Sequence, residues 1–442
     1  MRDIVVIGFI LGLIPFILAR AWIGVIAWTW IGLMNPHQLG WGFAGSFPVA
    51  MLVGAATLVA LVFEQQKKAP AMNVAMGVLL VTAVFYTVKM PLAWSNDMSW
   101  EVWNKTMKIF LMTFVMGMVI FGEYRIKWLL WTVVFSMGFY GLKGGIFSIV
   151  TGGNHHVQGP APSFISGNTE IGLAMNMVLP LILVAARHAQ RQWIRVLTYS
   201  TFWFTIIAIV FTYSRGALLG LAVAMLFILP GMKRKLLLTL ALVPVLIIGI
   251  VLTPEKLFDR AETIRTYEQD ESAMQRIQAW GVAKNIAIAH PLTGGGFGLQ
   301  DVNDDLWLSY ADFLGNWKNY ARAAHSIYFQ VLGEHGFVGI ALFLTLLFAT
   351  LVSLTRSRRV LLNIPEARWL ADYTWAVRIG IFAYIVSGAF LSLAYFDLLY
   401  LYVGLSAIIA REVIARQAAA ANRASTARIR SPIWSKGPAN SY

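Results

Sequence analysis

Long apolar runs with almost no charge constrain the fold of this chain more than any other feature of its sequence. Each has about the 20 residues that a helix needs to cross a hydrocarbon core of about 30 Å. Hydrophobic residues make up 58% of the 442 and charged residues only 13%, against about 25% charged residues in a soluble chain. The sequence therefore predicts an all-α polytopic membrane protein, with the lipid bilayer as its main surroundings.

The apolar runs predict about twelve transmembrane helices. The first run is too long for one straight helix and contains Pro15 and Arg20, so two short helices would give thirteen. Its start resembles a signal peptide, but apolar sequence continues to Met34 and predicts a retained anchor. The predicted spans are residues 4–34, 47–63, 72–89, 105–122, 128–150, 170–186, 196–213, 217–231, 236–252, 336–355, 374–392 and 395–411.

Basic loops alternate onto one side of this topology, which the positive-inside rule assigns to the cytoplasm. Both termini are then cytoplasmic, and the basic tail at 412–442, rich in Ala and Ser, is expected to be disordered. The net charge of +14 reports this orientation, and we expect no nucleic-acid partner. The basic loops lie at residues 67–68, 125–127, 187–195, 233–235 and 356–359.

One large outer segment, residues 253–335, separates the N-terminal transmembrane helices at 1–252 from the C-terminal ones at 336–411. It holds 11 Asp or Glu against 7 Lys or Arg, and it is much longer than an ordinary loop. We expect an extracytoplasmic unit with short helices that carries active-site residues. The chain has no cysteine, which excludes disulfides and thiol chemistry.

Three residues on the outer side are the main catalytic candidates. His325 precedes a strongly apolar run, and a histidine there can take a proton at neutral pH. Arg215 lies between two apolar spans joined by almost no loop, and Arg276 lies on a predicted helix over residues 275–289. Arginines can grip phosphate through two hydrogen bonds, although Arg215 could instead snorkel to headgroups and Arg276 could lie on a solvated helix face.

Further candidates could bind phosphate or sugar. Trp280 and Lys284 follow Arg276 on the same helix face, and Tyr328 follows His325 closely. Lys143 lies deep in a span near the outer leaflet, where charged residues usually have a partner or ligand. Two more arginines have weaker context, Arg265 and Arg322.

No metal site or cofactor is expected. His335, beside Glu334 and Gly336, is typical of the start of a helix rather than of a base. The pair at 155–156 has no third ligand at metal spacing. Asp301, Asp304 and Asp305 could hold a divalent cation, but a solvated acidic loop explains them as well.

The motifs Tyr213-Ser214-Arg215-Gly216, His290-Pro291-Leu292-Thr293-Gly294-Gly295-Gly296-Phe297-Gly298 and His325-Ser326-Ile327-Tyr328 occur in this order. Together, over residues 165–410, they resemble the bacterial O-antigen ligase and polymerase superfamily. Met34-Asn35-Pro36-His37 with Trp41-Gly42-Phe43 resembles its exosortase-associated O-glycosylation ligase branch. Ser326 stands where the family often has Asn, which puts a direct role for that position in doubt.

The resemblance implies a GT-C-like membrane glycosyltransferase of the bacterial inner membrane with a periplasmic active site. It would move a polysaccharide from undecaprenyl pyrophosphate to lipid A-core, with inversion and without metal. The family's essential histidine corresponds to His325, and its arginines to Arg215 and Arg276. From the residues themselves, His325 suits a general base and the arginines suit a departing pyrophosphate.

Other functions remain open from the sequence. A polymerase that joins two undecaprenyl-linked chains needs nearly the same residues, and a ligase that glycosylates protein is a third enzyme alternative. A transporter for lipid-linked sugars would carry charges deep in several spans and usually an internal repeat. The spans here are nearly free of charge, which favours an enzyme.

Overall fold

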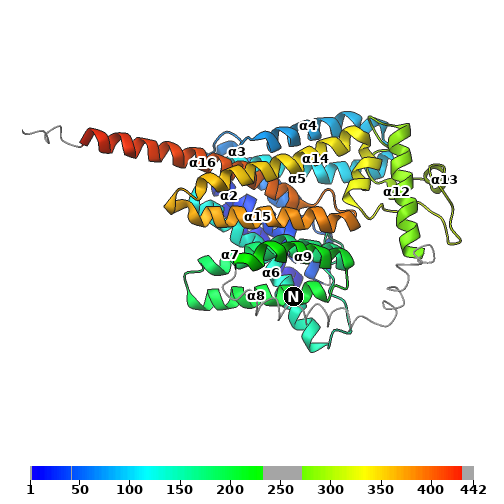
Figure 1. The fold of residues 1–442 in the computed structure, drawn as a ribbon, viewed down its shortest axis with the longest axis horizontal. Coiled ribbons are helices and arrows are strands. Elements are labelled where there is room, and N and C mark those ends of the chain that lie inside the picture. Colours follow the sequence, from blue (N-terminus) through cyan, green and yellow to red (C-terminus); the bar gives the residue numbers. More distant parts are fainter. Residues whose placement is uncertain (1, 41, 232–270, 431–442) are drawn as a thin grey trace, which may run out of the picture.

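The protein is all-helical over the residues that its computed structural model describes, which are 2–40, 42–231 and 271–430 (Figure 1). The predicted span 236–252, the basic loop at 233–235 and the candidate Arg265 lie outside these residues. The longer helices are α1 (Arg2–Ala19), α2 (Ala21–Met34), α3 (Val49–Phe63), α4 (Val74–Lys89), α5 (Asn96–Val119), α6 (Gly122–Val150), α7 (Asn168–His188), α8 (Gln192–Val210), α9 (Arg215–Ile228), α12 (Glu271–Ala289), α14 (Ile327–Leu361), α15 (Arg368–Ser387) and α16 (Asp397–Arg430).

Membrane-spanning character is clear for many of these helices but does not establish the predicted count of twelve. Eight described helices are long and apolar enough to cross a membrane, and three shorter ones, α2, α3 and Arg215–Gly231, are also apolar. The first predicted span is two helices, because Arg20 between α1 and α2 adopts an extended conformation with φ −149° and ψ 104°. The two-helix alternative for residues 4–34 is therefore the one observed.

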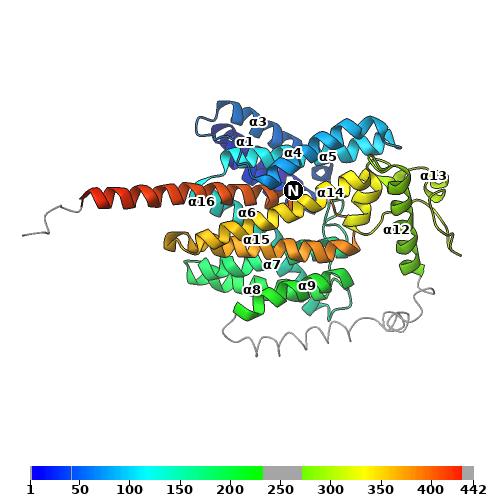
Figure 2. The ribbon, with the colours of Figure 1, turned by 45° about the horizontal axis from the view of Figure 1, so that its top comes forward.

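The bundle has two chemically different ends. Figures 1 and 2 show α12 lying across one end and α16 protruding from the other. Basic loops meet at the α16 end, where Arg411 donates to the Gly117 carbonyl at 2.6 Å and Arg125 donates to Gln66 at 2.5 Å. The candidate catalytic residues lie at the α12 end, so the fold separates them from these basic loops.

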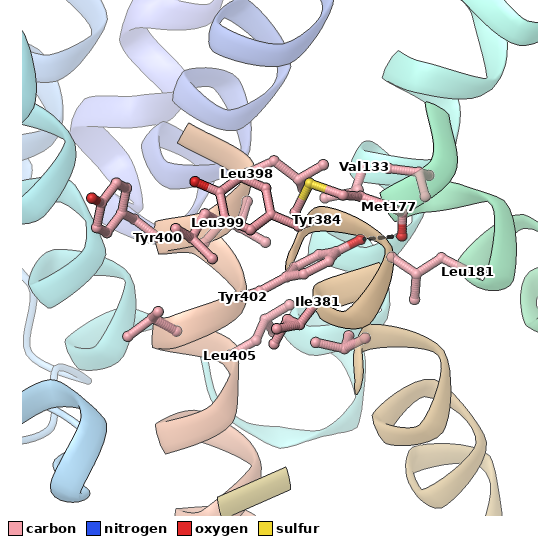
Figure 3. Packing of buried hydrophobic residues seen from close by; sticks show 14 of the residues in the cluster. Val133, Met177, Leu181, Ile381, Tyr384, Leu398, Leu399, Tyr400, Tyr402 and Leu405 are labelled. Carbon is pink, nitrogen blue, oxygen red and sulfur yellow. Dashed lines mark hydrogen bonds between the residues drawn. The ribbon is translucent and has the colours of Figure 1, made fainter. Parts of the chain in front are cut away.

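Helix α7 forms the centre of the core. Every residue from Ile171 to Ala186 is buried. Helices α6, α8, α9 and α15 pack against it, and α16 reaches it through Tyr402 (Figure 3). The Tyr402 hydroxyl donates to the Met177 carbonyl at 3.0 Å. A Cβ on Gly380 of α15 would lie 2.4 Å from the same carbonyl, so a glycine is needed where these two helices approach, as is common in membrane bundles.

Helix α16 corrects one expectation. We predicted a disordered tail from residue 412, but the helix continues to Arg430. The stretch contains a run of alanines at 418–421, and alanine has the highest helix propensity. Only residues 431–442 of the tail lie outside the described part of the chain.

Helix α14 is broken at Gly336, near the candidate site. Gly336 has non-helical angles, φ 65° and ψ −165°, between two helical stretches. The stretch before it, from Ile327, belongs to the α12 end, and the stretch after it runs through the bundle. The sequence placed the start of a span at residue 336, which agrees with this second stretch.

Candidate functional site

Arg215 lies in the first turn of α9 because the preceding turn is very tight. Ser214 caps the helix, its hydroxyl accepting from the Ala217 N–H at 3.2 Å, and Tyr213 adopts a left-handed φ of 52°. The cap ends one helix and starts the next within a few residues. The Arg215 side chain is therefore exposed at the α12 end of the bundle.

Arg215 and Arg276, far apart in sequence, line one open cavity of about 430 Å³. The first turns of α7, α9 and α12 form most of its wall. Among the described residues that line it, which include Asn168, Thr169, Tyr213, Ser272 and Phe390, none is a carboxylate. The cavity is thus suited to an anionic group held between two guanidiniums.

His325 stands immediately before α14 and is exposed, with a left-handed φ of 46°. Its pKa lies below the usual histidine value, first because the surrounding protein partly desolvates the ring and then because Arg276 and Arg322 are positively charged. The depressed pKa keeps the imidazole neutral at pH 7. A neutral histidine can accept a proton.

Trp280 supports the segment that carries His325. Its indole Nε1 donates to the Ala324 carbonyl at 2.7 Å, and its ring stacks on Phe329 with 5.1 Å between centroids and 7° between planes. One ring face is therefore covered by protein. Trp280 thus holds the chain before His325, at Ala324, and after it, at Phe329.

The remaining candidates on and after α12 contact protein groups. Lys284 pairs with Asp312 at 3.2 Å, and the Tyr328 hydroxyl donates to the Ile385 carbonyl at 2.8 Å. Arg322 is buried, donates to the Lys318 carbonyl at 3.1 Å and lies over the Tyr320 ring. Its role toward His325 is electrostatic.

Lys143 does not belong to the cavity of the arginines. It lines a second open cavity of about 300 Å³, next to α6 and the loop that follows it. The two cavities have no lining residue in common. The structure thus separates this lysine from the proposed pyrophosphate ligands.

Glu334 is a structural residue that the sequence did not single out. Its Oε1 accepts from the Gly298 N–H at 3.0 Å, and its Oε2 accepts from the Tyr395 hydroxyl. Its backbone carbonyl accepts from Lys89 Nζ at 2.5 Å and from the Gly296 N–H at 3.0 Å. One buried glutamate therefore joins α4, the glycine-rich loop, α14 and the segment before α16.

His335 is buried in the same cluster. Its side chain has no solvent exposure, and its Nε2 lies 2.6 Å from the Tyr395 hydroxyl. The ring packs on Tyr86 with 3.9 Å between centroids and meets the edge of Phe297 at 4.5 Å. This packing places His335 away from the arginine cavity, at the end of the helical stretch that His325 precedes.

The glycine-rich loop fits against the break in α14. The Phe337 N–H donates to the Pro291 carbonyl at 2.8 Å, and a Cβ on Gly336 would lie 2.5 Å from that oxygen. Gly294 has a φ of 61°, and its Cβ would lie 2.5 Å from the His335 nitrogen. The sequence shows Glu334-His335-Gly336 and a glycine-rich loop, but it does not indicate that the two segments contact each other.

The acidic residues of the outer segment make local contacts. Asp304 accepts from the Ala321 N–H at 2.9 Å, and Asp301 accepts from Gln300 at 2.7 Å. Within residues 2–40, 42–231 and 271–430, no three His, Asp or Glu side chains form a group that could hold a metal ion.

Comparison with known families is consistent with this geometry. Residues 200–344 match the family described as O-Antigen ligase, Wzy_C, and this stretch contains Arg215, Arg276, His325 and Glu334. Residues 1–190 match a family of unknown function, DUF5935. No curated protein matches the chain significantly. The first match supports the O-antigen ligase and polymerase superfamily, and with the apolar helices it indicates a multi-pass membrane enzyme acting on lipid-linked sugars.

Proposed function

We propose that the protein is an O-antigen ligase, which transfers a polysaccharide from undecaprenyl pyrophosphate to a sugar hydroxyl of lipid A-core. The new bond joins the acceptor oxygen to the anomeric carbon of the donor, and the bond from that carbon to the pyrophosphate oxygen breaks. The acceptor proton goes to His325. Attack from the face opposite the leaving group inverts the anomeric configuration.

One observation carries this proposal: Arg215 and Arg276 line a single cavity, and Arg276 is close enough to His325 to lower its pKa. Two fixed cations can neutralise the charge that builds on a departing pyrophosphate. A base held neutral by the same cations can deprotonate the acceptor. The three roles that the reaction needs thus gather at one end of the bundle.

The same proposal assigns an orientation to the bundle in the inner membrane. The end with the basic loops and α16 would face the cytoplasm, following the positive-inside rule. The N-terminus would lie at the other end, contrary to the sequence-based expectation, because α1 and α2 are two helices and Asp3 accepts from the Gly42 and Ala44 N–H groups beyond α2. The end with α12 and the arginine cavity would face the periplasm, where both lipid-borne substrates can approach from the outer leaflet.

A transfer assay with purified protein tests the function. Lipid-linked glycan is supplied with lipid A-core, with a second lipid-linked glycan, or with a protein acceptor, and products are separated by mass. We expect product only in the reaction that contains lipid A-core as the acceptor. Chain extension of the lipid-linked glycan would identify a polymerase, and modified protein would identify the exosortase-associated type of ligase.

The His325→Ala variant completes this assay. Removal of a positioned general base typically costs about 10²-fold or more in rate, while donor binding should persist because the arginines remain. If donor affinity in His325→Ala fell by the same factor as the transfer rate, His325 would organise the cavity rather than accept the proton.

A further inference from the structure

The second cavity, beside Lys143, has the composition of a ligand site. Its volume of about 300 Å³ is at the lower end for pockets that hold small molecules. The lining is mostly apolar, with Leu39, Phe147, Val157 and Ile171. Three exposed polar residues also line it: Lys143, His156 and Gln158.

Lys143 is the charged group of this cavity. Over residues 2–40, 42–231 and 271–430, no Asp or Glu lines this cavity, and Lys143 has no ion pair or hydrogen bond with any residue of these ranges. His156 Nε2 and Gln158 Nε2 are 2.7 Å apart and hydrogen-bonded to each other. An anion with oxygen acceptors would complement one ammonium and two neighbouring polar side chains.

The cavity adjoins an exposed apolar surface of α6 that lipid chains could cover. On α6, Lys143 is followed at helical spacing by Ile146, Phe147 and Val150, which are 45%, 42% and 79% exposed. Residues three, four and seven apart share one helix face. A ligand with a negative headgroup and apolar chains could therefore place its chains along α6 and its charge at Lys143.

A thin wall separates the two cavities. The Val157 N–H donates to the Phe211 carbonyl at 3.0 Å, and the Tyr213 hydroxyl donates to the Gly153 carbonyl at 2.5 Å. Val157 lines the Lys143 cavity and Tyr213 lines the arginine cavity. The turn that presents Arg215 is thus hydrogen-bonded to the loop that forms the Lys143 cavity.

We propose that the Lys143 cavity binds a phosphate of the acceptor glycolipid, while the arginine cavity binds the donor pyrophosphate. This inference rests on the proposed function, because it assumes a second substrate that is lipid-borne and phosphorylated. The glycan of that lipid extends past the wall, so that its terminal hydroxyl reaches His325. Two phosphate sites on opposite sides of one wall keep donor and acceptor from exchanging places.

Acceptor binding tests this proposal directly. Wild-type protein in nanodiscs is titrated with fluorescent lipid A-core, intact or enzymatically dephosphorylated, in the absence of donor. Lys143→Gln should weaken binding of the intact lipid by about 10-fold or more, as expected for loss of a charged hydrogen bond. Lys143→Arg should recover most of the lost affinity. The dephosphorylated lipid should bind wild type and Lys143→Gln equally.

Two controls identify the source of any effect. Lys105→Gln removes an exposed lysine that pairs with Glu101 at 2.6 Å, and it should change nothing. Donor affinity, titrated separately, should be the same in Lys143→Gln as in the wild type. Equal affinity of Lys143→Gln and wild type for intact lipid, or loss of donor binding only, would overturn the proposal.

The binding measurement separates this inference from the proposed function. If wild type binds the phosphorylated lipid through Lys143 but transfers no glycan to it, the site stands and the ligase reaction fails. Competition with phosphatidylglycerol distinguishes a general headgroup site: displacement of lipid A-core at equal concentration would overturn the assignment to the acceptor.

Discussion

The hydroxyl of Tyr395 should contribute more to stability than any ordinary buried tyrosine hydroxyl of this protein. It lies between Glu334 Oε2 and His335 Nε2, and all three side chains are buried. In Tyr395→Phe both partners lose that contact without gaining water. A buried polar group left unsatisfied costs about 1–3 kcal/mol, so two of them cost about 2–6 kcal/mol.

Tyr402→Phe is a matched control for this change. Tyr402 lies in α16, seven residues after Tyr395, is also buried, and donates one hydrogen bond, to the Met177 carbonyl. Loss of one such bond costs about 1 kcal/mol.

Unfolding of both variants in mixed micelles, followed by far-UV circular dichroism, measures the difference. We expect Tyr395→Phe to lose at least about 1 kcal/mol more than Tyr402→Phe. A double-mutant cycle with Glu334→Gln should give a coupling energy of about 1–3 kcal/mol, since the residues share one contact. Equal losses in the two tyrosine variants, or additive losses in the cycle, would refute the role of the hydroxyl as a bridge.

Three further results are expected in the transfer assay. The rate should rise with pH through a midpoint below the usual histidine value of about 6.5, because burial and nearby arginines lower the pKa of His325. Arg322→Gln removes one of these positive charges and should move the midpoint upward. An unmoved midpoint would contradict the electrostatic role of Arg322. Arg215→Lys should lose about 10-fold or more in kcat/KM, because an ammonium lacks the two-pronged contact, and near-normal activity would reduce Arg215 to bulk charge. Excess EDTA should leave the rate unchanged, because the arginines neutralise the leaving group; loss of activity restored by Mg²⁺ would favour a site at Asp304 and its neighbours.

The positions of most helices followed from the sequence because apolar runs of membrane length leave few alternatives. The approximate depth of Arg215 also followed, since two apolar spans with almost no loop place it at a surface. The division of residues 4–34 was less certain, because it depends on the extended backbone of one residue, Arg20. Local patterns thus predicted elements better than their ends.

The partners of Glu334 could not be predicted from the sequence. They come from α4, the glycine-rich loop and the segment before α16, and hydrophobic periodicity carries no information about contacts between distant segments. The sequence assigned His335 only to the start of a helix. Its complete burial against Tyr86 means that His335→Ala would leave a cavity costing several kcal/mol, so His335→Phe is the gentler control for His325→Ala.

The surroundings of Lys143 also depend on contacts between distant segments that the sequence does not reveal. Its depth in the membrane indicated a charged ligand, and the sequence grouped it with the arginines because all lie on the outer side. The turn at Phe211 to Tyr213 and the loop after α6 separate them, through hydrogen bonds between segments about 50 residues apart. Charge and depth predicted an anionic ligand for Lys143, but they did not predict that this lysine lines a different cavity from Arg215 and Arg276.

The cavity between Arg215 and Arg276 has a consequence for turnover under the proposed function. Two arginines are among the described residues that line it, so it should retain undecaprenyl pyrophosphate after the glycan has left, since the charge it recognises remains on that product. Spent carrier would then compete with fresh donor. The rate of the enzyme in a membrane would depend on how quickly the used carrier is removed, and the pool of carrier lipid would regulate glycan transfer without any separate regulatory site.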